Sequence, residues 1–446
     1  MTLRNKATSI RLRDFSSAPM RAFHMTWLAF FLCFFGWFGI APLMPIIRQE
    51  LQLTKDQIGN LTIASVAITV LVRLLIGWMC DRIGPRRAYT WLLILGSLPV
   101  MGVGLAHDYS TFLIFRLAIG AIGASFVITQ YHTSVMFAPN IVGTANATAA
   151  GWGNLGGGVT QMVMPLLFAG FVSMGVGNWW GWRMAMFVPG LLMFVAGILY
   201  YRLTQDTADG DFTELRAKGL MTGRAAASGA FAAACRDRRV WALALMYGAC
   251  FGMELTIDNI AALYFTDYFG LGLTAAGFVA GSFGMMNLFA RALGGIVSDR
   301  FHRNWGLRGR ALLLGGTLLA EGLALILFSQ MRVLTLAVGA MMLTGLFIKM
   351  SNGATYAIVP FVNRKALGAV AGIVGAGGNV GAVLAGFLFK GAMPWAQALA
   401  YLGATIAVIS VFSVVVRFSE EEELSARKEI DARMAGELVA APVMGD

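Results

Sequence analysis

The chain contains twelve apolar runs that, as helices, are each about as long as a lipid bilayer is thick, and this limits the folds that it can adopt. A bilayer core of roughly 30 Å is crossed by about 20 helical residues, and backbone groups surrounded by lipid must bond within their own helix. Hydrophobic residues make up 58% of the chain and charged residues only 13%, which is unlike a soluble domain. We therefore predict an all-α, polytopic membrane protein. The approximate limits of the twelve runs are 23–47, 58–80, 88–106, 111–137, 142–174, 183–203, 239–268, 274–299, 310–329, 333–356, 366–390 and 394–417.

Most of the 34 lysines and arginines fall on loops at one side of the predicted helices, together with both chain ends. Cytoplasmic loops carry this excess, so we expect both termini in the cytoplasm and the chain in the cytoplasmic (inner) membrane. The basic N-terminal arm precedes an apolar run long enough to span, which argues against a cleaved signal. Since the basic residues are scattered over short loops, the net charge of +11 does not predict nucleic-acid binding.

One pattern, RxxxGxxxDR, occurs twice and divides the chain into two similar halves. Its two copies consist of Arg73, Gly77, Asp81 and Arg82, and of Arg291, Gly295, Asp299 and Arg300. A long polar segment lies between the halves. We predict an N-terminal six-helix bundle over 1–203, a cytoplasmic linker over 204–238, a C-terminal six-helix bundle over 239–417 and a cytoplasmic tail over 418–446. The tail opens with glutamates 420–423, and its charges suggest a short solvated helix without chemistry.

Arg73 and Arg291 are placed where a charge is costly. Each lies eight residues before its DR pair, so at 1.5 Å per residue it is roughly 12 Å inside the membrane. An intramembrane arginine tends to mark a substrate pathway, and transporters built from repeats bind substrate at this depth. The two arginines therefore predict an anion site shared by both halves. The alternative for each is an ordinary ion pair with one of the buried acids Glu254, Asp258 and Glu321.

A second repeated element carries an asparagine in a glycine-rich setting. AGWGNLGGGVTQ (150–161) is matched by AGIVGAGGNVGAVLAG (371–386), which puts Asn154 and Asn379 in equivalent positions. Glycines let helices approach closely, and each buried Asn brings an amide that needs a partner. Substrate contact and an interhelical bridge are both open for each Asn. Functional and structural roles are likewise open for Arg116, where snorkelling would be the structural one.

The segment GWMCDRIGPRR (77–87) resembles the signature loop of the major facilitator superfamily. The wider sequence resembles the nitrate/nitrite porter family of that superfamily, and within it the high-affinity nitrate importers, in RAFHMTWLAFFLCFFGWFGIAPLMPIIRQEL, VGTANATAAGWGNLGGG, FGMELTIDNIAALYF, SFGMMNLFARALGG and GAVAGIVGAGGNVGAV. The resemblance implies two pseudo-symmetric six-helix bundles that work by alternating access. It also implies a conformational latch, in which Gly permits close helix packing and Asp and Arg pair with a neighbouring helix end. The latch residues are Gly77, Asp81, Arg82, Arg86, Asp299 and Arg300.

The same resemblance implies a substrate site made of two arginines, one asparagine and three aromatic rings. These residues are Arg73, Arg291, Asn154, Phe126, Tyr247 and Phe251. Taken alone, Tyr247 and Phe251 would be ordinary packing, because they lie four residues apart on one helical face. The repeat itself adds Asn379 as a further substrate-binding candidate.

Nitrate would suit such a site because it is planar, monovalent and rich in acceptor oxygens, which guanidinium groups bind in bidentate fashion. Moving an anion into a cell that is negative inside costs about 2.3 kcal/mol per 100 mV, and import with two protons would reverse the sign of the charge moved. The proton-carrier candidates are Glu254, Asp258 and His132. Plain hydrogen-bonding roles are open for the last two, and Lys349 is a further buried charge that could pair with one of the acids.

We therefore expect an importer of nitrate, with nitrite left open as a second substrate, that is coupled to protons and works as a monomer in the lipid bilayer. Nitrate/nitrite exchange and a transporter-derived nitrate sensor are the alternatives. No enzyme is expected, because no nucleophile with its base, no metal-ligand cluster and no nucleotide-binding loop stands out. No cofactor is expected either.

Overall fold

The computed structural model describes residues 5–138, 141–219, 230–363 and 367–424, and nearly all of these are helical. The helix bounds are α1 Ala18–Phe38, η1 Ala41–Leu43, α2 Met44–Glu50, α3 Lys55–Ile83, α4 Pro85–Gly102, η2 Val103–Leu105, α5 Tyr109–Gly120, η3 Ala121–Ala124, α6 Ser125–Met136, α7 Val142–Ser173, α8 Gly177–Leu203, α9 Phe212–Ala217, α10 Ala230–Arg236, α11 Arg238–Phe269, α12 Leu273–Met285, η4 Met286–Leu288, α13 Ala290–Gln330, α14 Leu334–Val362, α15 Leu367–Leu388, α16 Trp395–Ile409 and η6 Ser410–Val415. In the described ranges the only bridges of β type are two isolated ones. The all-α prediction is confirmed.

Local sequence signals set several helix boundaries. The Thr54 hydroxyl accepts from the backbone N–H of Gln57, and the Gln57 side chain bonds back to Thr54 N, a capping box that starts α3. Gly84 has a φ of 88° and separates α3 from α4, which then begins at Pro85. Gly270, with a φ of 66°, ends α11 in the left-handed conformation that glycine tolerates.

The twelve predicted crossings correspond to eleven continuous stretches of membrane-spanning length and composition among the described residues. One stretch, Leu273–Gln330, has 58 residues, which would extend about 87 Å as a single straight helix. Its backbone reverses at Gly306, where φ is 65°, and across that turn Arg310 Nη2 bonds to Asp299 Oδ1 at 2.7 Å. This stretch therefore holds two crossings, the predicted eighth and ninth.

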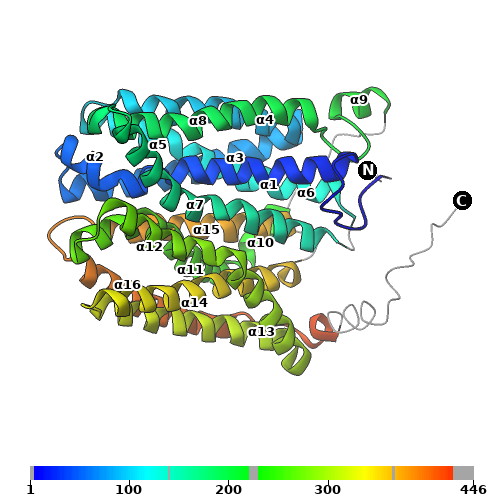
Figure 1. The fold of residues 1–446 in the computed structure, drawn as a ribbon. Coiled ribbons are helices and arrows are strands. Elements are labelled where there is room, and N and C mark those ends of the chain that lie inside the picture. The colour runs from blue at the N-terminus through cyan, green and yellow to red at the C-terminus, as the bar shows by residue number, and fades with distance from the viewer. Residues whose placement is uncertain (1–4, 139–140, 220–229, 364–366, 425–446) are drawn as a thin grey trace, which may run out of the picture.

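The membrane helices form two groups, which lie one above the other in Figure 1. We call α1 to α8 the N-bundle and α11 to η6 the C-bundle. Within the bundles the largest contacts are those of α4 with α8, α1 with α7, α13 with α14 and α11 with α15, and the bundles meet mainly along α7 with α12 and α3 with α15. Gly158 and Gly284 allow the first of these junctions, since a Cβ atom at Gly158 would lie 2.6 Å from the carbonyl carbon of Gly284.

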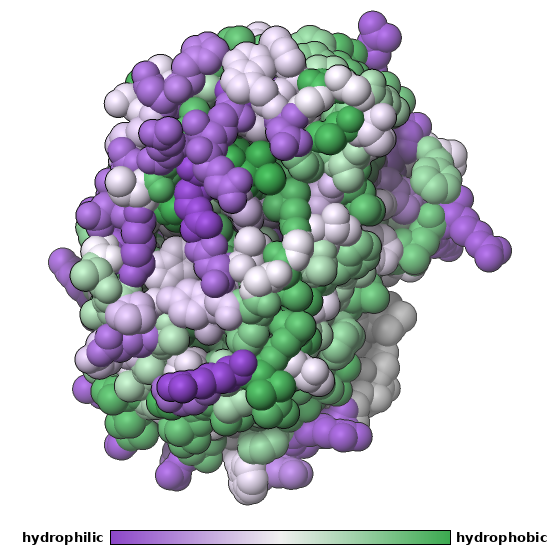
Figure 2. Space-filling model, turned by 60° about the vertical axis from the view of Figure 1, so that its left-hand side comes forward, coloured by the Kyte–Doolittle hydropathy of each residue, from purple (hydrophilic) through white to green (hydrophobic). Residues whose placement is uncertain are grey.

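The molecule has two polar ends and an apolar flank. We call them the α2 end, on the left in Figure 1, and the α9 end, on the right, where both described chain ends lie. Figure 2 turns the α2 end forward and shows hydrophilic residues gathered on it, with hydrophobic residues prevailing on the flank. Large exposed apolar side chains such as Leu74, Leu191 and Leu323 belong to that flank. The arrangement is that of a multi-pass membrane protein.

Hydrogen bonds join the bundles at the α2 end. Arg48 in α2 makes a two-pronged contact with Asp267 in α11, at 2.5 and 2.7 Å. Lys55 Nζ donates to the carbonyl of Met393, and the backbone N–H of Gly391 donates to Asp56. We call these three contacts the α2-end gate, and in this structure it is closed.

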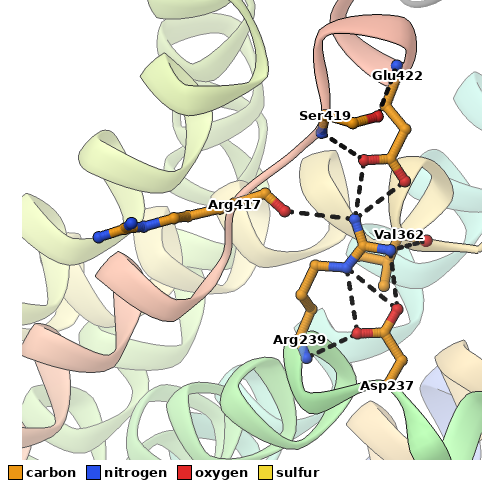
Figure 3. A network of polar contacts seen from close by, with 6 residues as sticks. All are labelled: Asp237, Arg239, Val362, Arg417, Ser419 and Glu422. Atoms are coloured by element: carbon orange, nitrogen blue, oxygen red, sulfur yellow. Dashed lines mark hydrogen bonds and ion pairs between the residues drawn. The ribbon is translucent and has the colours of Figure 1, made fainter.

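The start of the predicted tail is bound to the C-bundle at the α9 end (Figure 3). Arg239 donates to Asp237, to Glu422 and to the carbonyls of Val362 and Arg417. The next glutamate, Glu423, accepts from the backbone N–H groups of Leu307 and Arg308, beside the Gly306 turn. The predicted solvated helix is thus a docked one over its described part. Residues 220–229 of the predicted linker and 425–446 of the tail lie outside the described residues.

Candidate functional site

Arg73, on α3, reaches across to α15 of the other bundle. Its Nη1 donates to the carbonyl of Gly375 at 2.9 Å. When the Asn379 amide is turned so that its oxygen faces the guanidinium, that oxygen accepts from Nη1 at 3.0 Å and from Nε at 3.2 Å. The ring of Phe126, from α6, lies 5.7 Å from Arg73 Cζ, within the range of a cation–π contact. The structure thus brings together the predicted Arg73, Asn379 and Phe126.

Arg291, on α13, belongs to a polar cluster in the C-bundle. Its Nη2 donates to Glu254 Oε2 at 2.8 Å, and Lys349 Nζ donates to Glu254 Oε1 at 3.0 Å. Asn287 and Asn352 add donor amides to the same carboxylate, at 2.8 and 2.5 Å. We call these five residues the Glu254 cluster. It contains both the ion pair weighed above as the alternative for Arg291 and the expected pairing of Lys349 with an acid.

Stacked aromatic rings lie between the two arginines. The rings of Tyr247 and Phe251 stack with centroids 5.0 Å apart and 6° between planes, and Tyr356 meets Tyr247 edge-on at 5.2 Å. Phe251 lies 5.8 Å from Arg291 Cζ. At the other side, a Cβ atom at Gly375 would lie 3.5 Å from the Tyr356 hydroxyl and 3.6 Å from Arg73 Nη1. The aromatic rings thus connect the surroundings of Arg73 with those of Arg291.

Three members of this region were not predicted from the sequence: Tyr356, Asn352 and Asn287. A usable signal was present for the first two. Lys349, Asn352 and Tyr356 follow the spacing i, i+3 and i+7, which puts three polar side chains on one face of an otherwise apolar helix. Asn287 lies in a short 3-10 turn before α13, where no helical spacing marks it.

Asn154 is buried on α7, with 3% of its surface exposed, and its Nδ2 has no partner. The same helical face carries Gly157 and Gln161. Gln161 Nε2 donates to the backbone carbonyl of Asp258 at 2.6 Å, and a Cβ atom at Gly157 would lie 3.7 Å from Asp258 Oδ2. Asn154 therefore lies on the α7 face that meets α11, and in the described structure no hydrogen bond joins it to either arginine.

The three proton-carrier candidates have different surroundings. Glu254 is held by two cations and two amides, as described above. Asp258, 6% exposed, has one carboxylate oxygen, Oδ1, without a hydrogen-bond partner. His132 is bound on both ring nitrogens, to the Tyr200 hydroxyl at 2.5 Å and to the Gln205 carbonyl at 2.8 Å. Asp258 alone keeps an acceptor position open, and His132 has the contacts of a structural residue.

The N-bundle latch residues are bound within their own bundle and the linker. Asp81 accepts from the Tyr131 hydroxyl at 3.1 Å, and Arg216 in α9 donates to the backbone carbonyls of Asp81 and Arg82. Arg86 donates to the carbonyl of Tyr201 at 2.7 Å and pairs with Asp211. These contacts tie α3, α4, α8 and the linker together at the α9 end.

The close helix packing expected at the latch residue Gly77 is absent. A Cβ atom at Gly77 would meet no atom within 4 Å, so that expectation is wrong for this conformation, and the equivalent glycine of the second repeat, Gly295, is equally open. The physical reason lies in the position of the two glycines, which are on the α9-end parts of α3 and α13, away from the closed α2-end gate. In the C-bundle the pairing of Asp299 is with Arg310, across the Gly306 turn.

Taken together, the arrangement suits a small anion better than a metal or a cation. One guanidinium and one ammonium pair with Glu254, Arg73 bonds to neutral acceptors, and two buried donors, Arg291 Nε and Asn154 Nδ2, lack an acceptor. Buried donors without partners are costly, and an oxyanion supplies acceptors. Within the described residues no three His, Cys, Asp or Glu side chains are grouped so as to hold a metal ion.

Comparison with known proteins places the chain among membrane transporters. Residues 26–360 match the family description "Major Facilitator Superfamily". "High affinity nitrate transporter 2.5" of Arabidopsis thaliana is 41% identical over 86% of this chain and 76% of its own length. "Nitrate/nitrite transporter NrtP" of Nostoc punctiforme is 30% identical over 82% of this chain and 85% of its own. Among solved structures, a bacterial homolog to the human lysosomal transporter Spinster, in an inward-facing and unoccupied conformation, shares the fold with a TM-score of 0.66 at 17% identity, over 93% of this chain and 98% of that one.

Proposed function

The chain belongs to the major facilitator superfamily, within the group of the high-affinity nitrate transporters, and we propose that it imports nitrate by alternating access of its two bundles. The observation that carries the proposal is the pair Arg73 and Arg291. They occupy equivalent positions of the two repeats, and aromatic rings lie between them. One arginine comes from each bundle, so an anion bound by both would hold the bundles together.

Nitrate matches the donors that this region offers. Its three oxygens lie in one plane, as do the N–H groups of a guanidinium, so one arginine can bind two oxygens at once. Arg291 donates from Nη2 to Glu254 and keeps Nε unpaired, while Arg73 donates to a neutral carbonyl and to Asn379. Nitrate would therefore replace a neutral acceptor of Arg73, and it would supply the acceptor that Arg291 Nε lacks. The rings of Phe126, Tyr247 and Phe251 favour a small flat ion.

We assign the α9 end to the cytoplasm. The basic loops and both described chain ends lie there, as the excess of Lys and Arg on cytoplasmic loops requires. The closed α2-end gate would then face outward, and the open packing at Gly77 and Gly295 would face inward. In this reading the structure represents the inward-facing state, from which nitrate leaves into the cell.

The test is uptake of labelled nitrate into proteoliposomes by the parent chain and by the variants Arg73→Lys and Arg291→Lys. Lysine keeps the charge but loses the planar fork, so we expect each variant to lower kcat/KM for nitrate by about tenfold or more, equivalent to at least about 1.4 kcal/mol. Arg202→Lys, at the exposed end of α8, is the matched control and should transport like the parent. Normal uptake by both site variants would disprove the site, and no uptake by the parent would disprove the function.

Proton coupling is proposed through Asp258, with Glu254 as the fixed counter-ion of Arg291 and Lys349. Asp258 keeps Oδ1 free for a proton, whereas Glu254 is surrounded by donors. An inward proton gradient should stimulate uptake by the parent but not by Asp258→Asn, which should still exchange labelled nitrate across the membrane. Full stimulation of Asp258→Asn would remove Asp258 as the carrier.

Nitrate/nitrite exchange is the second candidate, favoured by the relative from Nostoc punctiforme, whose name includes both anions. Both anions are planar or nearly so and carry one charge, so the same arginines would bind either. Exchange predicts that nitrite inside the liposomes stimulates nitrate uptake while a proton gradient has no effect. Stimulation by the gradient without internal nitrite would exclude it.

A further inference from the structure

Arg116, on α5, is a buried guanidinium whose bonds all go to neutral acceptors. Only 2% of its surface is exposed. Its Nη1 donates to the carbonyl of Trp37 at 2.8 Å and its Nη2 to Asn259 Oδ1 at 2.5 Å, while Nε has no partner. Among the described residues no carboxylate forms an ion pair with it. A buried charge in this condition is costly, which makes a purely structural role a poor explanation.

A second buried arginine near the same end shows what a structural solution looks like. Arg183, 4% exposed, pairs with Glu50 at 2.6 Å and donates to the carbonyls of Gly104 and Trp179. All these partners belong to the N-bundle. Arg183 is thus neutralised inside one rigid body. Arg116 instead bonds to Asn259, which belongs to the opposite bundle, and no carboxylate among the described residues neutralises its charge.

The contact between Arg116 and Asn259 lies in the passage between the α2-end gate and the central site. Arg116 is seven residues from the start of α5 at the α2 end, about 10 Å along the helix. Asn259 lies five residues beyond Glu254 on α11, about 8 Å nearer to the α2 end. The gate contact Arg48–Asp267 lies further along the same helix. A solute that moves along α11 from the gate to Arg291 would pass this contact.

We propose that Arg116 is a recruitment site for a small monovalent oxyanion on the external side of the central site. The inference rests on the alternating-access import proposed above. When the bundles separate at the α2 end, Asn259 moves away with the C-bundle, and Nη2 joins Nε in facing the opened passage with two free donors. An anion accepts from both, and the charge of Arg116 holds it until Arg73 and Arg291 take it over. When the gate closes, Asn259 Oδ1 replaces the anion and prevents its return.

Asn259→Asp tests the proposal because it adds one negative charge at the partner of Arg116 and changes the shape very little. The new carboxylate would pair with Arg116 while the bundles are together at the α2 end, would oppose their separation, and would compete with an anion that approaches Arg116. We expect the KM for external nitrate to rise about tenfold or more, as a competing buried charge pair implies, while the thermal unfolding temperature stays level or rises. Asn60→Asp is the matched control, since Asn60 also lies near this end but bonds to Tyr109 within the N-bundle, and its KM should match that of the parent.

Asn259→Leu removes the partner of Arg116 instead of charging it, and it provides a second test in case Asn259→Asp does not fold. It removes the acceptor that replaces the anion, so KM should fall or stay level while kcat falls, because closing the gate then leaves Arg116 without a partner. Opposite shifts of KM in the two variants support recruitment at Arg116. A parental KM in folded Asn259→Asp, or a raised KM in folded Asn259→Leu, overturns it. If the parent itself transports no nitrate, the proposed function fails instead.

Discussion

Glu254 is the residue on which the charge balance of the central region depends. Its carboxylate is 2% exposed and lies within 3.0 Å of donors from Arg291 and Lys349. The two cations around it would repel each other without it, and Lys349, whose side chain is fully buried, has no water to compensate its charge. Glu254 therefore balances the charges of Arg291 and Lys349 and leaves Arg291 Nε unpaired, as the proposed substrate site requires.

Lys349→Met tests this balance, because it removes one cation and leaves a side chain of similar length. A buried ion pair that loses one partner is destabilised by about 3 kcal/mol, so we expect a clear drop in the thermal unfolding temperature of the purified protein. The double variant Lys349→Met/Glu254→Gln removes the stranded charge as well and should recover part of the loss. A double variant that loses the sum of both single effects would contradict the role of Lys349 as a partner of Glu254.

Site residues could be predicted from the sequence where they recur in both repeats or where a charged side chain lies inside the membrane. Arg73 and Arg291 stand out because an arginine in an apolar run is rare and these two are in register. Their partners were much harder to predict. Gly375 contributes only a carbonyl, and Tyr356 meets Tyr247 through packing of α14 on α11. Contacts between distant helices depend on how those helices pack, and one sequence does not contain that information.

At the scale of elements, a buried carboxylate, that of Asp206, is one of the groups that attach the linker to the latch. Asp206 Oδ1 accepts from the backbone N–H of Arg86 and Oδ2 from that of Phe212, both at 3.0 Å. A Cβ atom at Gly84 would overlap that carboxylate, at 2.2 Å, so the glycine there gives room for the contact. Burial raises the pKa of Asp206 to about 6, although the N–H of Phe212 acts in the opposite direction.

This raised pKa predicts that the linker contact weakens as the pH rises. Asp206 has a pKa of 3.8 in a free chain, so between about pH 4 and pH 6 the folded state binds more protons than the unfolded one. The contribution of Asp206 to stability then falls by up to about 3 kcal/mol across that window and stays level above it. Hydrogen exchange at Phe212, corrected for its intrinsic rate, should be slower at pH 5 than at pH 7.5. Asp206→Asn should abolish the difference, and faster exchange at pH 5 would contradict the prediction.

The docked start of the tail holds the turn between the two limbs of α13. Glu423 accepts from Leu307 N at 2.7 Å and from Arg308 N at 3.1 Å, and charge-assisted bonds to backbone amides are stronger than neutral ones. Glu423→Gln should therefore weaken the turn by about 1 kcal/mol and speed hydrogen exchange at both amides. Glu421→Gln, on an exposed neighbour, should leave exchange unchanged, and equal effects of the two variants would contradict the contact.

Element boundaries were largely predictable, because length, hydropathy and glycine or proline at the ends act locally. The predicted run 142–174 is α7, Val142–Ser173, and the run 239–268 is α11, Arg238–Phe269. What the sequence did not reveal was how the elements use their polar ends. The four glutamates that begin the tail look like a solvated stretch, yet two of them bind Arg239 and the Gly306 turn. Whether a charge is solvated or docked depends on distant partners.

At the scale of the whole molecule, the alternating access proposed above would require the α2-end gate to open. The Arg48–Asp267 pair has side chains 28% and 29% exposed, and a pair of this kind contributes about 0.2–1 kcal/mol. That is small for stability but large for an equilibrium between two states, since about 0.8 kcal/mol changes their ratio about fourfold. A pair of this strength would favour closure and would still allow the gate to open in the cycle proposed above.

Arg48→Glu should shift the resting population toward the state that is open at the α2 end, because it replaces an attraction by a repulsion across the bundles. Spin labels at Ser110 and Gln397, both exposed at that end on opposite bundles, should report a larger share of long distances than in the parent. The charge swap Arg48→Glu/Asp267→Arg restores the pair in reverse and should restore the parental distances. If the swap leaves the distribution as open as the single variant does, Arg48 acts through something other than its charge, and the gate then depends on the bonds of Lys55 and Asp56 alone.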